Sequence, residues 1–425
     1  MIDFLKKITI RTWFVLGIFN LLLVASWGLL MRLKFVLPLP AVNQKYLLHA
    51  HSHFAFSGWV SHTLMALIAA AVCGQGSRGE LPWKYQLIVA ANLLASYGML
   101  ISFSLQGYGL YAICASSLTV VVSYVFAAMC WRDTRQPALG IPARNWLRAS
   151  LVFLVLSSAG TFFLAYLMAS RNTDNRIQLA AVYFFLHFQY NGWFFFACVG
   201  LLYHWLQRKG IYPRRTQSVF WLFALICAPT YFLSVLWWPM PSWLYLLVVA
   251  AVILQGGAWS IWLHSLLAKF SLYRHRLPAI AKWLLVGVAV AASIKIFLQG
   301  LSVIPSLSQL VYSFRPVVIG YLHLVLLVII TLFILAYAYM NGILRVNRVS
   351  LVSTGVLTAG IVLNELLLML QGLSGLAGIF IGHIPAALVG ASGIIFIGLI
   401  GLLRSQSKLT SRNHIDRVKS SSTSG

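Results

Sequence analysis

The chain has 425 residues, of which 60% are hydrophobic and only 9% are charged, and its mean hydropathy is +0.87. These values exclude a water-soluble globular protein and indicate a polytopic membrane protein. The net charge of +25 does not indicate nucleic-acid binding, because Lys and Arg collect in the cytoplasmic loops of membrane proteins.

Apolar runs of about 20 residues, long enough to cross a hydrocarbon core of about 30 Å, recur along the whole chain. They predict an all-α protein with twelve transmembrane helices in one domain over residues 1–405, followed by a polar, Ser-rich tail at 406–425 that we expect to be disordered and cytoplasmic. The predicted spans are 12–31, 47–73, 84–106, 108–131, 147–169, 178–206, 218–238, 241–267, 279–303, 316–340, 350–371 and 377–403.

The basic residues predict the orientation of these spans. With the N-terminus on the inside, most of the 31 Lys and Arg residues fall in the inner segments. Those in the outer loops are Arg32, Lys34, Lys45, Arg171, Arg176 and Arg315. The asymmetry predicts a multi-pass protein of the cell (inner) membrane, surrounded by lipid, with its N- and C-termini in the cytoplasm.

Ionisable side chains are costly inside hydrocarbon, so those that occur there usually pair, ligate or line a cavity. Histidine is the commonest of them here. The predicted spans carry His49, His51, His53, His62, His187, His204, His264, His323 and His383. Four of these, His53, His187, His323 and His383, lie about six to ten residues below the outer surface, or about 9–15 Å deep.

The second span cannot direct all its histidines at one ligand. His49 and His53 are four residues apart and share a helix face, whereas His51 points away from both. Either the His53 side or the His51 side therefore faces a cofactor.

Histidines on two helices at equal depth are a typical pair of axial ligands for haem iron. His53 on the second span and His323 on the tenth predict a bis-histidine haem, bound non-covalently because the chain has no CxxCH motif. Arg315 and Lys45 each stand eight residues, about two turns, before one of these histidines, where a cation can pair with a haem propionate.

Three segments resemble subunit I of the haem-copper oxidases and nitric oxide reductases. "HSHFAFSGW" resembles the low-spin haem helix, with His53 at the ligand position and His51 as the alternative. "LHFQYNGWFF" resembles the helix whose histidine, here His187, binds the active-site copper. "VIGYLHLVLL" resembles the tenth helix, in which His323 matches the low-spin haem ligand. The resemblance implies a bundle like that of cytochrome c oxidase subunit I.

The same comparison shows departures from the family pattern. Tyr321 replaces the active-site haem histidine, and "APTYFLSVLWWPMPSWLY" lacks the paired copper histidines. His187 alone is too few ligands for copper, so we do not expect copper and interpret His187 as a candidate vestigial ligand. We also weighed a second haem on Tyr321, since tyrosinate ligates haem iron in catalase.

The resulting hypothesis is a membrane protein with one haem b between the second and tenth helices. The resemblance implies an electron-transfer or diatomic-gas role, such as binding of NO or O2, with a redox protein or a quinol as partner. Oxidoreductase activity is left open, because the active-site ligands are incomplete. The alternative is a non-haem membrane transporter or an assembly factor that keeps the fold. Lys295 and Glu365, both inside predicted spans, are either proton-path residues or an ion pair.

Overall fold

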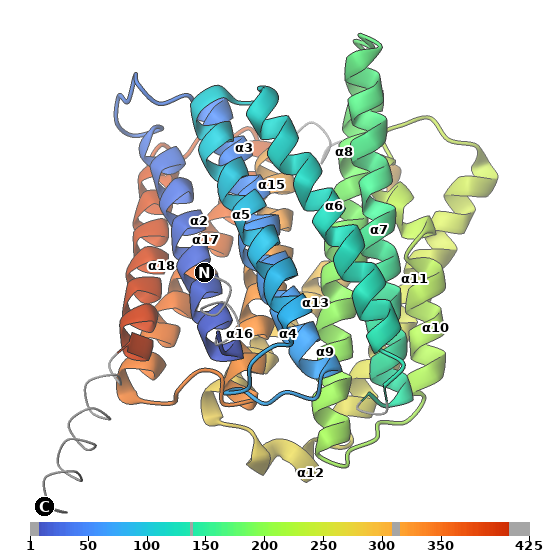
Figure 1. Cartoon of the computed structure of the whole chain (residues 1–425). Coiled ribbons are helices and arrows are strands. Elements are labelled where there is room, and N and C mark those ends of the chain that lie inside the picture. The colour runs from blue at the N-terminus through green and yellow to red at the C-terminus, as the bar shows by residue number, and fades with distance from the viewer. Residues whose placement is uncertain (1–7, 137–138, 308–314, 408–425) are drawn as a thin grey trace, which may run out of the picture.

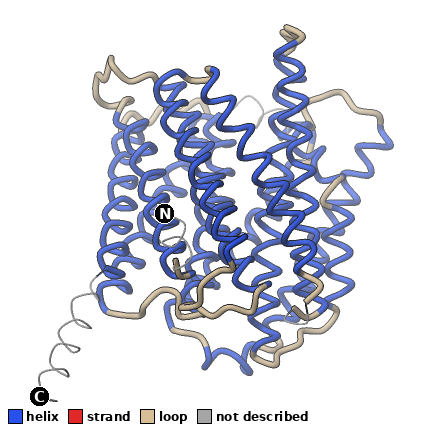
Figure 2. Tube along the Cα trace, in the orientation of Figure 1, coloured by secondary structure: helices blue, strands red, loops and turns tan. Residues whose placement is uncertain are grey.

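The computed structural model describes residues 8–136, 139–307 and 315–407, and within these ranges the chain is helical with short connections and no strands (Figures 1 and 2). The helices are α2 (Ile10–Leu33), α3 (Gln44–Phe54), η1 (Ala55–Ser61), α4 (His62–Val72), α5 (Trp83–Gln106), α6 (Leu110–Asp133), α7 (Ile141–Ala169), α8 (Asn175–His187), η2 (Phe188–Phe194), α9 (Phe195–Arg208), α10 (Thr216–Ile226), η3 (Pro229–Val235), α11 (Ser242–Leu267), α12 (Phe270–Tyr273), η4 (Arg274–Arg276), α13 (Ala279–Ser302), α15 (Arg315–His323), η5 (Leu324–Thr331), α16 (Leu332–Met340), α17 (Arg348–Leu376) and α18 (Ile384–Ser407).

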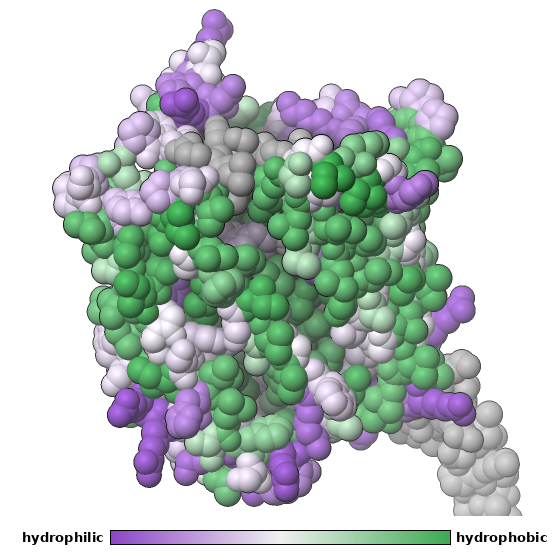
Figure 3. Space-filling model, turned by 180° about the vertical axis from the view of Figure 1, so that it is seen from behind, coloured by the Kyte–Doolittle hydropathy of each residue, from purple (hydrophilic) through white to green (hydrophobic). Residues whose placement is uncertain are grey.

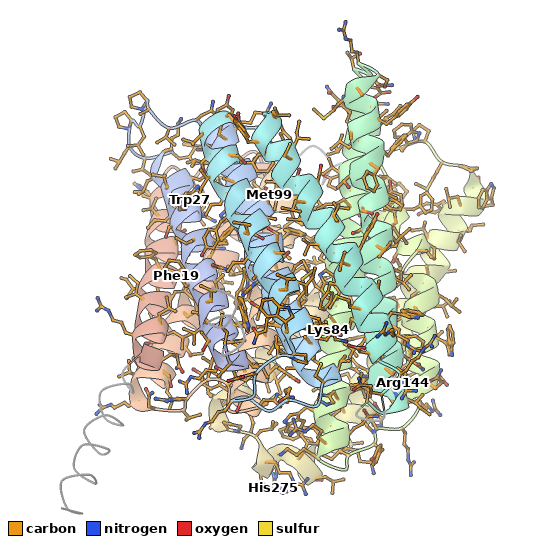
Figure 4. All side chains as sticks on the ribbon, in the orientation of Figure 1. Phe19, Trp27, Lys84, Met99, Arg144 and His275 are labelled. Carbon is orange, nitrogen blue, oxygen red and sulfur yellow. The ribbon has the colours of Figure 1, made fainter. Side chains whose placement is uncertain are left out.

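The bundle has the surface of a membrane protein. In the view of Figure 3, apolar side chains form a broad band around the middle of the helices, and polar side chains gather at the two ends. In Figure 4 the labelled basic residues Lys84, Arg144 and His275 all lie toward one end of the bundle. Ten helical runs among the described residues are long and apolar enough to cross a membrane. The prediction of an all-helical, polytopic membrane protein is confirmed at this level.

The count of twelve spans stays a prediction. The predicted seventh span is a pair of helices, α10 and η3, bent by 44°, which would make an eleventh span if counted as one. The predicted sixth span is helical from Asn175 to Arg208, through α8, η2 and α9, but it is not among the ten apolar runs. Buried polar residues, among them Gln189 and Asn191, lower its hydropathy. The predicted tail lies outside the described residues from residue 408 onward.

The second span, from α3 through η1 to α4, is the most enclosed helix. In its apolar window 89% of the residues are buried, against 22–50% in the other nine runs. It packs against α2 and α5, and its second half, α4, also contacts α9. Gly17 on α2 permits the close approach, since a Cβ there would lie 2.5 Å from the Thr63 hydroxyl oxygen. Of its four histidines, His62 is fully buried in the core, and His49, His51 and His53 are half-buried.

Three π-helical turns meet in this core. The segments η1, η2 and η5 belong to the predicted second, sixth and tenth spans. The Trp59 indole N–H of η1 donates to the Thr331 hydroxyl of η5 at 2.9 Å, and the Trp193 indole N–H of η2 donates to the Ser61 hydroxyl of η1 at 3.2 Å. The π turns directly follow His187 and His323, and η1 begins two residues after His53.

A π turn disturbs the regular backbone hydrogen bonds of its helix, and its carbonyls need other donors inside a membrane. Two buried asparagines of neighbouring helices supply them. Asn20 of α2 donates to the Gly58 carbonyl at 2.6 Å, and Asn92 of α5 donates to the Ser57 carbonyl at 3.1 Å. Tyr97 of α5 in turn donates to the Asn20 side-chain oxygen at 2.7 Å. The Gly58 and Ser57 carbonyls of η1 are thus satisfied by α2 and α5.

We expect Trp59→Phe to destabilise the fold by about 1–3 kcal/mol, because it removes a buried hydrogen bond between two π turns and leaves a small cavity. Thermal denaturation of the purified protein in detergent measures this as a lower midpoint temperature. Trp283→Phe is the matched control, since the Trp283 side chain is 75% exposed on α13. Equal midpoint temperatures for the two variants would show that the hydrogen bond between Trp59 and Thr331 contributes nothing to stability.

Candidate functional site

The histidines of the second span point to different neighbours. The His51 Nδ1 atom lies 3.0 Å from the Val24 carbonyl oxygen of α2. The His53 ring stacks on Phe103 of α5, with 4.4 Å between ring centroids, and its Nε2 atom bonds the Tyr108 hydroxyl at 3.0 Å. The opposite directions of His51 and His53 agree with the helical geometry expected from their spacing.

His53 is therefore placed away from the tenth span. Among the described residues its ring contacts are with His49, Phe103 and Tyr108, on its own helix, on α5 and in the turn between α5 and α6. Burial raises the pKa of Tyr108 above its usual value of 10, so this phenol stays neutral beside the imidazole. These contacts place His53 on the side of α3 that faces α5, and its role as a haem ligand stays a prediction.

His51 takes the position that the sequence left as the alternative. His323 of α15 interacts electrostatically with both His51 and Arg32, and His51 also interacts with Arg32. The His323 Nδ1 atom lies 2.8 Å from the Ile319 carbonyl oxygen. The structure thus brings His51, His323 and Arg32 together, from α3, α15 and α2.

The two imidazoles have the same hydrogen-bonding state. Each Nδ1 lies within hydrogen-bond distance of a backbone carbonyl, Val24 for His51 and Ile319 for His323. A carbonyl only accepts, so each Nδ1 carries the proton and each Nε2 presents a lone pair. Neither Nε2 atom forms a hydrogen bond within the described part of the chain. Metal-binding histidines are held in this way by a carbonyl behind the ring.

Arg32 connects this pair of histidines to an acidic residue. Its guanidinium donates to the Asn364 side-chain oxygen of α17 at 2.9 Å, and the Asn364 amide donates to Glu365 at 3.0 Å. Arg32 and Glu365 also attract each other electrostatically. The sequence missed Arg32 as a site residue because it was assigned to an outer loop, whereas α2 extends to Leu33 and places Arg32 in its last turn.

This network excludes the suggested Lys295–Glu365 ion pair. The charged neighbour of Glu365 is Arg32, whereas Lys295 interacts electrostatically with Cys227 and His187. The Arg315 side chain lies outside the described residues, so its predicted place at the rim of the site is untested.

His187 has both ring nitrogens engaged. Its Nε2 atom donates to the Cys227 carbonyl at 2.8 Å, and its Nδ1 atom accepts from the Asn191 amide at 3.1 Å. The side chain is 1% exposed. A ligand to copper would need one of these nitrogens, so metal binding here requires a change of hydrogen bonds. Within the described ranges, no group of three or more His, Cys, Asp or Glu side chains could hold a metal ion.

Two further histidines take structural or surface positions. His62 bonds the Trp13 carbonyl of α2 at 3.3 Å and meets the Trp13 ring edge-on. His383 is exposed and precedes α18, which begins at Ile384. The expectation that His383 shares the depth of the other histidines inside a span is wrong, because the predicted span started several residues too early.

A scan of protein-family models finds no match to this chain, and a search of curated proteins finds none either.

We expect His187→Ala to lower the unfolding free energy by about 2–4 kcal/mol, because it opens a cavity in the core, leaves the Asn191 amide without its partner and removes one of two hydrogen bonds to the Cys227 carbonyl. Bound copper, measured by elemental analysis, should equal that of the wild type. His264→Ala, at an exposed position on α11, is the control for the loss of an imidazole. A copper content that falls with His187→Ala alone would contradict the structural role.

Proposed function

We propose that the chain is an integral membrane b-type haem protein that transfers electrons, with one low-spin haem bound non-covalently between α3 and α15. His51 and His323 are the axial ligands in this proposal. The observation that carries it is the matched state of two imidazoles from different helices, each with Nδ1 bonded to a carbonyl and Nε2 open. When bound, the haem supplies reversible one-electron chemistry at iron.

The residues around the two imidazoles fit such a group. Arg32 is a cation beside both rings, as an ionised propionate in a membrane requires. Gly28 of α2 keeps the His51 ring uncrowded, since a Cβ there would lie 3.2 Å from the His51 Cε1 atom. In addition, α3 packs mainly on α2 and α5, and α15 on α17 and η5, so packing of α3 directly on α15 is not a main contact of either helix.

The surroundings of His187 and Tyr321 favour a protein without a copper site or an active-site haem. His187 has both nitrogens engaged, and Tyr321 stands where the resembling family carries its active-site haem ligand. Tyr321 packs edge-on against Tyr190, with 6.2 Å between ring centroids. The proposal is therefore a haem-copper-oxidase-like bundle of twelve helices that relays electrons or senses a gas such as NO, without its own oxygen-reducing centre. A redox protein or a quinol would donate the electrons.

The proposed orientation places the haem near the outer face. Lys84, Arg144 and His275 mark one end of the bundle (Figure 4), and the positive-inside rule makes this end cytoplasmic. Arg32, in the last turn of α2, belongs to the opposite end. The protein would then be a multi-pass protein of the cell membrane with both termini in the cytoplasm.

The ligand assignment is tested by the dithionite-reduced minus oxidised absorption spectrum of the purified protein. We expect the bands of a low-spin b-type haem in the wild type and about one iron per chain. His51→Ala and His323→Ala should each lower the haem content at least tenfold, because one axial ligand is lost. His53→Ala, on the same helix, is the matched control and should keep the haem.

Two results would contradict the assignment. Colourless protein from haem-replete cells would favour the alternative of a non-haem transporter or assembly factor. Loss of haem in His53→Ala with retention in His51→Ala would return the ligand role to His53.

We also expect the haem to be six-coordinate and therefore almost insensitive to carbon monoxide. Oxygen consumption with an artificial electron donor should stay at background, since reduction at a binuclear site needs an open haem next to a second metal with about three protein ligands. Metal analysis should give well under one copper per chain. Steady turnover that is lost in His187→Ala would contradict this prediction.

A further inference from the structure

A separate cavity of about 30 Å³ lies between the predicted sixth, seventh, eighth, ninth and tenth spans. Its walls are mostly apolar and aromatic, and they include Phe195, Phe223, Trp259 and Ile329. Its polar lining comes from Tyr190, Asn191, Cys227, Thr230, Gln255 and Lys295. One water molecule needs about 10–15 Å³ of such cavity volume, so the cavity holds one or two species of the size of water.

Lys295 of α13 brings a cation into this cavity without a counter-charge. No hydrogen bond to Lys295 forms within the described residues. The four carboxylates described are all elsewhere. Asp133 pairs with Lys84, Asp174 caps the N-terminus of α8, and Glu365 interacts with Arg32. Glu80, in the segment between α4 and α5, is exposed and pairs through its backbone with Thr9.

The neighbouring backbone does not replace the missing partner. The bend between α10 and η3 frees carbonyls in the cavity wall, but side chains already use them. The Cys227 carbonyl accepts from His187 at 2.8 Å and from the Thr230 hydroxyl at 3.0 Å. The Thr230 hydroxyl also contacts the Ile226 carbonyl at 2.9 Å. The Lys295 ammonium forms no hydrogen bond to a carbonyl of this bend.

Gln255 of α11 is the other unmatched polar group of the lining. Its side chain is buried, with 7% exposed, and its Oε1 atom has no hydrogen-bond partner among the described residues. Its amide nitrogen also makes no bond to the described chain. Lys295 and Gln255 thus offer N–H donors from two helices to the same small, apolar space.

We infer that this cavity binds one small inorganic anion, of the size of chloride or nitrite, which balances the charge of Lys295 and accepts hydrogen bonds from Lys295 and Gln255. An isolated charge in a low-dielectric interior costs several kcal/mol unless an opposite charge accompanies it. The volume excludes a quinol ring or a phosphate ester. Water alone would hydrate the ammonium but would leave its charge uncompensated.

Binding of radiolabelled chloride to the purified full-length protein tests this inference, in a buffer with gluconate as the bulk anion. We expect saturable binding that approaches one chloride per chain. Lys295→Met should lower the affinity at least tenfold, because it removes the charge and keeps most of the side-chain volume. Lys282→Met is the matched control on the same helix, and it should bind like the wild type.

The size selectivity of the wild-type protein provides a second measurement that does not depend on the folding of a variant. Bromide and nitrite should compete with labelled chloride, whereas sulfate and gluconate should not, because they exceed the cavity. Absence of saturable chloride binding in the wild type, equal binding by Lys295→Met, or equal competition by sulfate would each overturn the inference. The assay needs no haem, so its outcome is independent of the function proposed above.

Discussion

Backbone groups inside a membrane must find partners within the protein, and this constraint governs the core of the bundle. The π turn η1 disturbs the backbone ladder of the most enclosed helix. Asn20 from α2 and Asn92 from α5 complete its hydrogen bonds, so these helices can pack against it in one register only. Trp59 and Trp193 then fix η5 and η2 at the same level. The junction sets the depth and rotation of three helices together.

The directions of His51, His53 and His62 follow from their spacing along the second span. His51 and His53 precede η1, so the α-helical angle between them is preserved, and they point to opposite sides. His62 begins α4, directly after η1. It contacts the Trp13 carbonyl of α2, the helix that His51 also contacts, as regular spacing predicts, because eleven residues bring His62 back to the face of His51.

Much of the fold could be predicted from the sequence, because hydropathy directly reports the length of apolar helices. The bent seventh span and the polar sixth span are the exceptions, since their polar groups are matched by partners distant in sequence. The site was predicted less well. The tenth-span residue His323 lies in the cluster, but the choice between His51 and His53 depended on which face of α3 meets α15. The sequence did not indicate Arg32 as a site residue, because α2 extends further than predicted and carries Arg32 in its last turn. No apolar pattern distinguishes a π turn from an α turn.

The bundle treats its two intramembrane cations differently, and the difference follows from the location of the carboxylates. Arg32 is linked through Asn364 to Glu365, so a cation and an acidic group both lie in the surroundings of His51 and His323. A haem between these imidazoles would change its net charge by one on reduction. Groups of both charge signs nearby limit the electrostatic free-energy cost of either oxidation state. Lys295 lies near His187, whose ring is held neutral by its two hydrogen bonds. No carboxylate of the described residues pairs with the Lys295 ammonium. Only a bound anion, or loss of a proton from Lys295, can remove this positive charge.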